Sequence, residues 1–153
     1  MNDKIQLKQE LVNAYHQIVE ERIDLVEKNL KAVQESRNNE TKSSAGDKYE
    51  TGRAMLQIEE DNCKKQLHQA LLLRNQLRQI DPTKQKEKAG QGSLVFTNQG
   101  RYFISAALGQ VSLREETYFC ISPVSPVGRK IMGQEPGFRF EFNETEIEIR
   151  KIW

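Results

Sequence analysis

Two long amphipathic stretches without proline fill the first half of the chain and restrict its fold more than any other feature. The first runs from Ile5 to Val33, and its apolar residues recur in heptads along two neighbouring seams: Leu11, Ile18 and Leu25, and Val12, Val19, Val26 and Val33. The second keeps helical spacing and ends at Asp81–Pro82, with apolar residues at Leu56, Cys63, Leu67, Ala70, Leu77 and Ile80. A helix of about 30 residues is about 45 Å long, too long for the interior of a compact domain. Residues 1–81 therefore predict an antiparallel coiled-coil hairpin.

The segment between the two stretches has the composition of a turn. Residues 38–47, "NNETKSSAGD", are rich in Asn, Ser and Gly, which support turns and cap helices. We place the tip of the hairpin at about residues 38–50. Ser44 or Asp47 can cap the second helix, and capping is the ordinary role of a lone Asp at a helix start. Glu50 follows Asp47 by three residues, and Lys48 lies between them.

The composition changes after Pro82. Residues 82–91 are polar and rich in Lys, without apolar periodicity, and predict a linker. Residues 92–153 predict a small β domain, in which "SLVFT" and "RYFIS" flank a turn at Asn98–Gln99–Gly100 and "TYFCIS" is a buried strand.

Two further strands, "FRFEF" and "EIEIRKI", alternate with period two. One face of this pair is predicted to be core: Phe138, Phe140, Phe142, Ile147 and Ile149. Between the strands, Pro126 at a helix start and Gly133 at its end predict one short helix that covers the sheet. The predicted class is α+β, a long helical hairpin followed by a small antiparallel β domain.

Composition and charge argue against several classes of function. The chain has 23 basic and 22 acidic residues, so direct binding to free DNA, which needs a basic face, is not favoured. No stretch approaches the roughly 20 apolar residues of a membrane-spanning helix, and the N-terminus lacks the apolar core of a signal peptide, so we expect a cytoplasmic protein without membrane contact.

The His and Cys residues do not form a recognisable site in the sequence. His16 and His68 lie in helical runs without carboxylates or cysteines arranged around them as a metal site. Cys63 and Cys120 occur in unlike patterns, one helical and one strand-like, which favours small buried side chains over a disulfide, a metal ligand or a nucleophile.

The stretch from Ile121 to Phe138, "ISPVSPVGRKIMGQEPGF", resembles the signature of the C-terminal domain of the bacterial Gre transcript cleavage factors. The matching residues, in order and spacing, are Ser125, Pro126, Val127, Gly128, Arg129, Gly133 and Gly137. The order of parts also fits, because that family has an N-terminal antiparallel coiled coil followed by a small FKBP-like domain. The resemblance covers nearly the whole chain, although only this stretch is close in sequence.

The resemblance implies an accessory transcription elongation factor and not an enzyme by itself. In the family, the coiled-coil tip enters the secondary channel of a backtracked RNA polymerase. Acidic tip residues there help to hold a second Mg²⁺ ion, shared with the polymerase active site, for cleavage near the RNA 3′ end. The RNA is met only inside the polymerase complex, and the free factor binds no metal stably.

The family's tip reads roughly Gly-Asp-aliphatic-Ser-Glu-Asn, and the corresponding residues here are Gly46–Asp47–Lys48–Tyr49–Glu50–Thr51. Asp47 and Glu50 keep their spacing and are the predicted catalytic and Mg²⁺-binding pair. Glu40 is a rival for one of the two roles. Lys48, Tyr49 and Thr51 depart from the pattern, and the chain begins in the helix without the family's lead-in segment.

The FKBP-like domain is expected to dock on the polymerase rim and to lack prolyl isomerase activity. For Phe119, Val124 and Ile131, core packing is favoured over a docking contact. Two alternatives to cleavage stay open: a non-cleaving regulator that occupies the same channel, favoured by Lys48 and Tyr49, and a coiled-coil adaptor unrelated to transcription.

Overall fold

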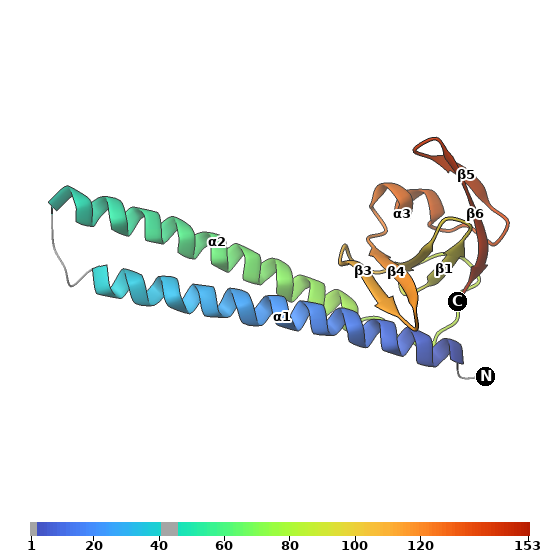
Figure 1. Ribbon diagram of the computed structural model, residues 1–153, viewed down its shortest axis with the longest axis horizontal. Coiled ribbons are helices and arrows are strands. Elements are labelled where there is room, and N and C mark those ends of the chain that lie inside the picture. Colours follow the sequence, from blue (N-terminus) through green and yellow to red (C-terminus); the bar gives the residue numbers. More distant parts are fainter. Residues whose placement is uncertain (1–2, 41–45) are drawn as a thin grey trace. The chain divides into compact units, whose positions relative to one another are not determined.

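The computed structural model describes residues 3–40 and 46–153, with the backbone alone for residues 40 and 46–49. Its elements are α1 (Asp3–Glu40), α2 (Gly46–Arg78), β1 (Leu94–Thr97), β2 (Arg101–Ile104), β3 (Gly109–Leu113), β4 (Glu116–Ile121), α3 (Pro126–Ile131), β5 (Arg139–Phe142) and β6 (Thr145–Ile152) (Figure 1). This confirms the predicted α+β class. No helix in the described part of the chain is long and apolar enough to span a membrane.

The chain divides by its internal contacts into two compact units. Residues 19–74 form the hairpin unit, which consists of most of α1 and α2. Residues 1–18 and 75–153 form the β unit, so the first turns of α1 belong to the same unit as the six strands.

In the hairpin unit α1 and α2 are antiparallel, as predicted. Three side-chain contacts join them: Glu20 with Arg74, Gln34 with Glu60, and Arg37 with Gln57. From each contact to the next, the residue number on α1 rises by the same amount as the residue number on α2 falls. The two helices therefore keep one register along the whole unit.

Of the two neighbouring seams predicted for α1, the one through Val19 and Val26 faces inward in the hairpin unit, and the one through Leu25 does not. Leu25 is 60% exposed, whereas Ile23 is buried and 3% exposed. The inward seam runs through Val19, Ile23 and Val26, which are spaced by four and then three residues. These steps sum to seven residues, so this seam keeps the heptad spacing. Leu25 comes one residue before Val26, about 100° round the helix, and falls outside it.

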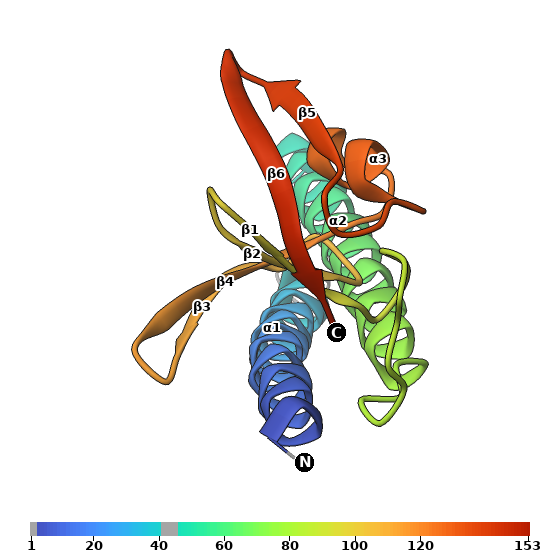
Figure 2. The same cartoon turned by 90° about the vertical axis from the view of Figure 1, so that its right-hand side faces the viewer.

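The β unit contains a six-stranded sheet in the order β3-β4-β2-β1-β6-β5 (Figure 2). The expectation of a purely antiparallel sheet is wrong for one pair, because β2 and β4 are parallel. From β2 the chain crosses to the edge of the sheet as β3, which was not predicted, and returns as β4 beside β2. β3 is antiparallel to β4, so the chain reverses direction twice between β2 and the end of the hairpin, and β4 runs in the direction of β2.

The core of the β unit lies between the sheet and α3. It is built from Ala89, Val95, Ile104, Ile131 and Ile149, all buried. Ile147 and Ile149 are buried as predicted, but Phe138, Phe140 and Phe142 are only half-buried. These aromatic residues lie on or next to β5, which is an edge strand and therefore has a neighbour on one side only.

The first turns of α1 contribute one large side chain to the β unit. Tyr15 is fully buried, and its ring stacks on Phe103 with 6.2 Å between centroids. Its hydroxyl donates to the backbone oxygen of Tyr118 at 3.2 Å, and the backbone oxygen of Gly109 is a second acceptor at 3.4 Å. At the sheet edge, Arg114 forms ion pairs with Asp3 and Glu10 of the same helix.

Lys8 is a buried amine in the same helix. It is 2% exposed, and its Nζ donates to the backbone oxygen of Lys84 at 3.0 Å. Burial, together with the positive charge of Lys86, lowers the pKa of Lys8 to about 8. Burial of the charged amine therefore lowers the stability of the folded state.

We expect Lys8→Met to be more stable than the wild type at pH 7, with a difference that shrinks as the pH rises. The folded state releases the Lys8 proton near pH 8, whereas the unfolded state keeps it up to about pH 10.4. Between these values the unfolded state binds more protons, so the contribution of Lys8 to stability rises with pH. Urea unfolding at pH 7, 8, 9 and 10 measures the difference, and a gap independent of pH would contradict the expectation.

Candidate functional site

The predicted acidic pair lies in the first turns of α2. This helix begins at Gly46, so Asp47 and Glu50 are both helical. Positions three apart on a helix share one face, so the backbone places the pair on the same side of these turns. Glu50 is exposed. The side chains of Asp47 and of Glu40, the last residue of α1, lie outside the described side chains, and the roles predicted for all three residues stay predictions.

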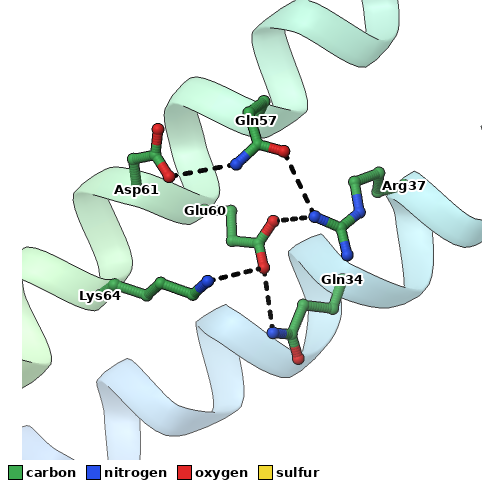
Figure 3. Close-up of polar contacts among 6 residues, drawn as sticks. All are labelled: Gln34, Arg37, Gln57, Glu60, Asp61 and Lys64. Carbon is green, nitrogen blue, oxygen red and sulfur yellow. Dashed lines mark hydrogen bonds and ion pairs between the residues drawn. The ribbon is translucent and has the colours of Figure 1, made fainter.

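A polar cluster crosses from α1 to α2 in the hairpin unit, and we call it the Glu60 cluster. It consists of Gln34 and Arg37 on α1 and Gln57, Glu60, Asp61 and Lys64 on α2 (Figure 3). The Glu60 carboxylate is at its centre and is 2% exposed. The hydrogen bond from Gln34 and the positive charges of Arg37 and Lys64 lower the pKa of Glu60, which keeps the carboxylate ionised.

The sequence analysis did not single out the Glu60 cluster, although the sequence holds a signal for it. In α2 the seam positions alternate by four and three residues: Leu56, Glu60, Cys63, Leu67, Ala70, Arg74 and Leu77. Glu60 and Arg74 are the charged members of this series. A charge at a seam position of a coiled coil is unusual and commonly specifies register or partner. That signal would have identified Glu60.

The motif that carries the family resemblance builds α3. The Ser125 side chain accepts a hydrogen bond from the Gly128 backbone N–H at 3.1 Å, which caps the helix, and Pro126 fills a first-turn position. A side chain at Gly128 would meet the backbone oxygen of Ser122 at 2.2 Å. Gly133 and Gly137 have φ values of 78° and 98°, which favour glycine. These motif residues therefore determine the local backbone of the β unit.

The three residues weighed between core and docking roles have different environments. Ile131 is fully buried, as core packing requires, and Phe119 is half-buried, with its ring centroid 5.9 Å from that of Tyr102. Val124 is 67% exposed, so the expectation of core packing is wrong for this residue. It lies in the loop before α3, where the chain turns to reach Ser125.

The remaining candidates do not gather into a site. Cys120 is buried, and burial raises its pKa to about 11, which keeps the thiol protonated and unreactive. Cys63 is half-buried in α2. Among residues 3–40 and 46–153, apart from the side chains not described, no three His, Cys, Asp or Glu residues are grouped so that they could hold a metal ion.

Comparison with known proteins gives a likeness among solved structures. No protein-family model and no curated protein matches the chain. Among solved structures, one described as the structure of the transcription factor Gfh1 is similar, with 15% sequence identity and a TM-score of 0.38. The match covers 90% of this chain and 92% of that chain.

Proposed function

We propose that this protein binds RNA polymerase and brings the carboxylates of Asp47 and Glu50 to its active site, where they promote cleavage of backtracked RNA. The observation that carries the proposal is the position of these two residues. Both lie on one face of the first turns of α2, where the second helix of a long antiparallel hairpin begins.

The donor set suits a shared Mg²⁺ ion. Asp47 and Glu50 would contribute carboxylate oxygens, which Mg²⁺ prefers, and Glu50 is exposed. Mg²⁺ takes six oxygen ligands, so two carboxylates can complete a site only when other groups and waters supply the rest. When bound between the tip and the polymerase, the ion would activate the attacking water and stabilise charge on the phosphate. Asp47 and Glu50 would add negative charge and fix the position of this water.

The β unit supports the second half of the proposal, attachment to the polymerase. Its motif builds α3, and the loop before α3 leaves Val124 exposed at the surface. An exposed apolar side chain of this kind is available for a contact with another protein, although single exposed apolar residues are common on protein surfaces. In the proposed function the β unit docks on the polymerase and the hairpin enters the channel.

The test is cleavage in a backtracked elongation complex with cognate polymerase, Mg²⁺ and RNA labelled at its 5′ end. We expect wild-type protein to accelerate release of the RNA 3′ fragment. Asp47→Asn/Glu50→Gln should reduce the acceleration on the order of 100-fold, because loss of metal ligands removes several kcal/mol of transition-state stabilisation. Binding of both proteins to the complex is measured in parallel.

Asp24→Asn/Glu27→Gln is the matched control. These residues have the same types and spacing as the tip pair, and both are exposed on α1 within the hairpin unit. We expect this variant to cleave like the wild type. Binding without any acceleration by the wild type would contradict cleavage and favour the non-cleaving regulator, to which Lys48 between the carboxylates also points. Failure to bind polymerase would contradict both and favour an adaptor.

A further inference from the structure

Glu60 is a charged residue buried in an otherwise largely apolar seam, and its partners come from both helices. Gln34 Nε2 donates to its Oε1 at 3.1 Å, and Arg37 Nη1 is paired with its Oε2. Lys64 Nζ lies 3.4 Å from Oε1. The carboxylate is thus satisfied by one amide and two cations, as a buried charge requires (Figure 3).

The cross-helix contacts of the Glu60 cluster fit a single register. Gln34 lies opposite Glu60, and Arg37, one turn along α1, lies opposite Gln57, one turn back along α2. Gln57 is held in turn by donation from its Nε2 to Asp61 Oδ1 at 3.1 Å. All of these cross-helix contacts are therefore made together in one register of the two helices.

In one possible slip of a heptad, each residue of α2 lies opposite an α1 residue seven positions earlier in the chain than its native partner. This slip separates the partners of the Glu60 cluster. Glu60 would then lie opposite Glu27, and Arg53 would take its place opposite Gln34. The buried carboxylate would lose Arg37 and Gln34, keep only Lys64 of its own helix, and face a second carboxylate. Removing the partner of a buried charge is strongly unfavourable.

A slip in the opposite direction is equally mismatched. Leu67 would take the place of Glu60 opposite Gln34, and Lys64 would take the place of Gln57 opposite Arg37. Two cations would then face each other across the hairpin. Slips that are not multiples of seven residues turn other faces of the helices into the seam and bury different side chains.

We infer that Gln34, Arg37 and Glu60 fix the register of the hairpin and so act as positioning residues for the first turns of α2; the importance of those turns rests on the proposed function. A heptad slip moves α2 by about 10 Å along α1. Since α1 ends at Glu40 and α2 begins at Gly46, a slip must unwind or add turns at these helix ends. Asp47 and Glu50 lie in such turns, so the register decides where they are.

The test compares register, stability and cleavage in Gln34→Leu/Arg37→Leu/Glu60→Leu. Nitroxide labels at Asp24→Cys and Glu59→Cys, both exposed positions, report the register by pulsed electron paramagnetic resonance in a Cys63→Ala/Cys120→Ala background. These two sites are offset along the hairpin, so sliding changes the distance between them. We expect one distance population with the native cluster and a second one, from helices offset by about 10 Å, in the triple variant.

The unfolding midpoint separates positioning from simple stabilisation. Apolar replacement of a buried ionic cluster is commonly neutral or stabilising, so we expect the triple variant to unfold at the wild-type temperature or above it. We expect it nonetheless to lose at least tenfold in cleavage. Glu60→Gln keeps the shape of the side chain and removes its charge. We expect its second distance population to be smaller than that of the triple variant.

Glu20→Gln/Arg74→Gln is the control for loss of a cross-helix ion pair. This pair also joins the helices, at 3.4 Å, but its side chains are 46% and 26% exposed, and we expect a single distance population. One unchanged population in the triple variant, or a lower unfolding midpoint, would overturn the inference. Because the distance measurement needs no polymerase, it decides the register even if the wild type fails to promote cleavage.

Discussion

Gly128→Ala destabilises the β unit by at least about 2–3 kcal/mol, the cost of overpacking a tight site together with a disturbed helix cap. A Cβ atom at this position would lie 2.2 Å from the backbone oxygen of Ser122 and 2.8 Å from Ser125 Oγ. The Ser122 oxygen cannot retreat freely, since it accepts from the Ser125 backbone N–H at 3.0 Å and from its hydroxyl at 2.7 Å. Relief of the clash therefore breaks the turn that starts α3.

Urea unfolding followed by the fluorescence of Trp153 measures this effect. Trp153 is the single Trp of the chain and belongs to the β unit, where its ring contacts Phe96 with 4.7 Å between centroids. Gly90→Ala is the matched control, because nothing lies within 4 Å of the Cβ position there, and we expect a change within about 0.5 kcal/mol. Equal midpoints for the two variants would show that the close approach at Gly128 is absent in solution.

Tyr15→Ala costs the β unit about 3–5 kcal/mol, the range for removing a large buried aromatic side chain. Tyr15 is fully buried and joins the first turns of α1 to the sheet through its ring contact with Phe103. Truncation leaves a cavity that neither the helix nor the strands can fill without moving. The same fluorescence measurement reports the loss.

Tyr15→Phe divides this effect between the ring and the hydroxyl. It removes only the hydroxyl, which donates to the backbone oxygen of Tyr118 and also lies near that of Gly109, so we expect a loss of about 1 kcal/mol. If the two substitutions were equally damaging, the hydrogen bond and not the ring would dominate. A negligible effect of Tyr15→Ala would show that the first turns of α1 do not belong to the folded β unit.

The long helices and most of the strands could be predicted because their signals are local. Apolar spacing identified both helices, and period-two alternation identified β5 and β6. The exposure of Leu25 could not be predicted from a strict heptad. Leu25 and Val26 lie on neighbouring heptad seams that are both apolar in the sequence, and only the packing of α1 against α2 decides which seam faces inward.

Strand β3 was missed because both of its signals are weak. Its residues, "GQVSL", are exposed or half-buried at the edge of the sheet, so apolar alternation is faint. The turn into β4 places Arg114 and Glu115 at φ values of 52° and 65°, where Asn-Gly or Asp-Gly is usual. Ion pairs of Arg114 with Asp3 and Glu10 hold this turn, and such long-range support is invisible to local reasoning.

The candidate site also has one part that could be predicted from the sequence and one part that could not. The spacing of Asp47 and Glu50 was readable in the sequence, and the helical start of α2 at Gly46 agrees with a shared face. The cross-helix partners of Glu60 could not be predicted without the pairing of α1 with α2, because Gln34 and Arg37 are distant in the chain. Only the presence of a charge at the seam was available in advance.

The common register of α1 and α2 also limits how the length of such a hairpin can change in evolution. Glu20 with Arg74 and Gln34 with Glu60 are separated by equal numbers of residues on the two helices. A deletion in one helix alone would shift every contact beyond it out of phase. Removing seven residues from each helix would keep the seam and shorten the hairpin by about 10 Å. The length of the hairpin would therefore vary in discrete steps, through paired changes in two distant segments of the gene.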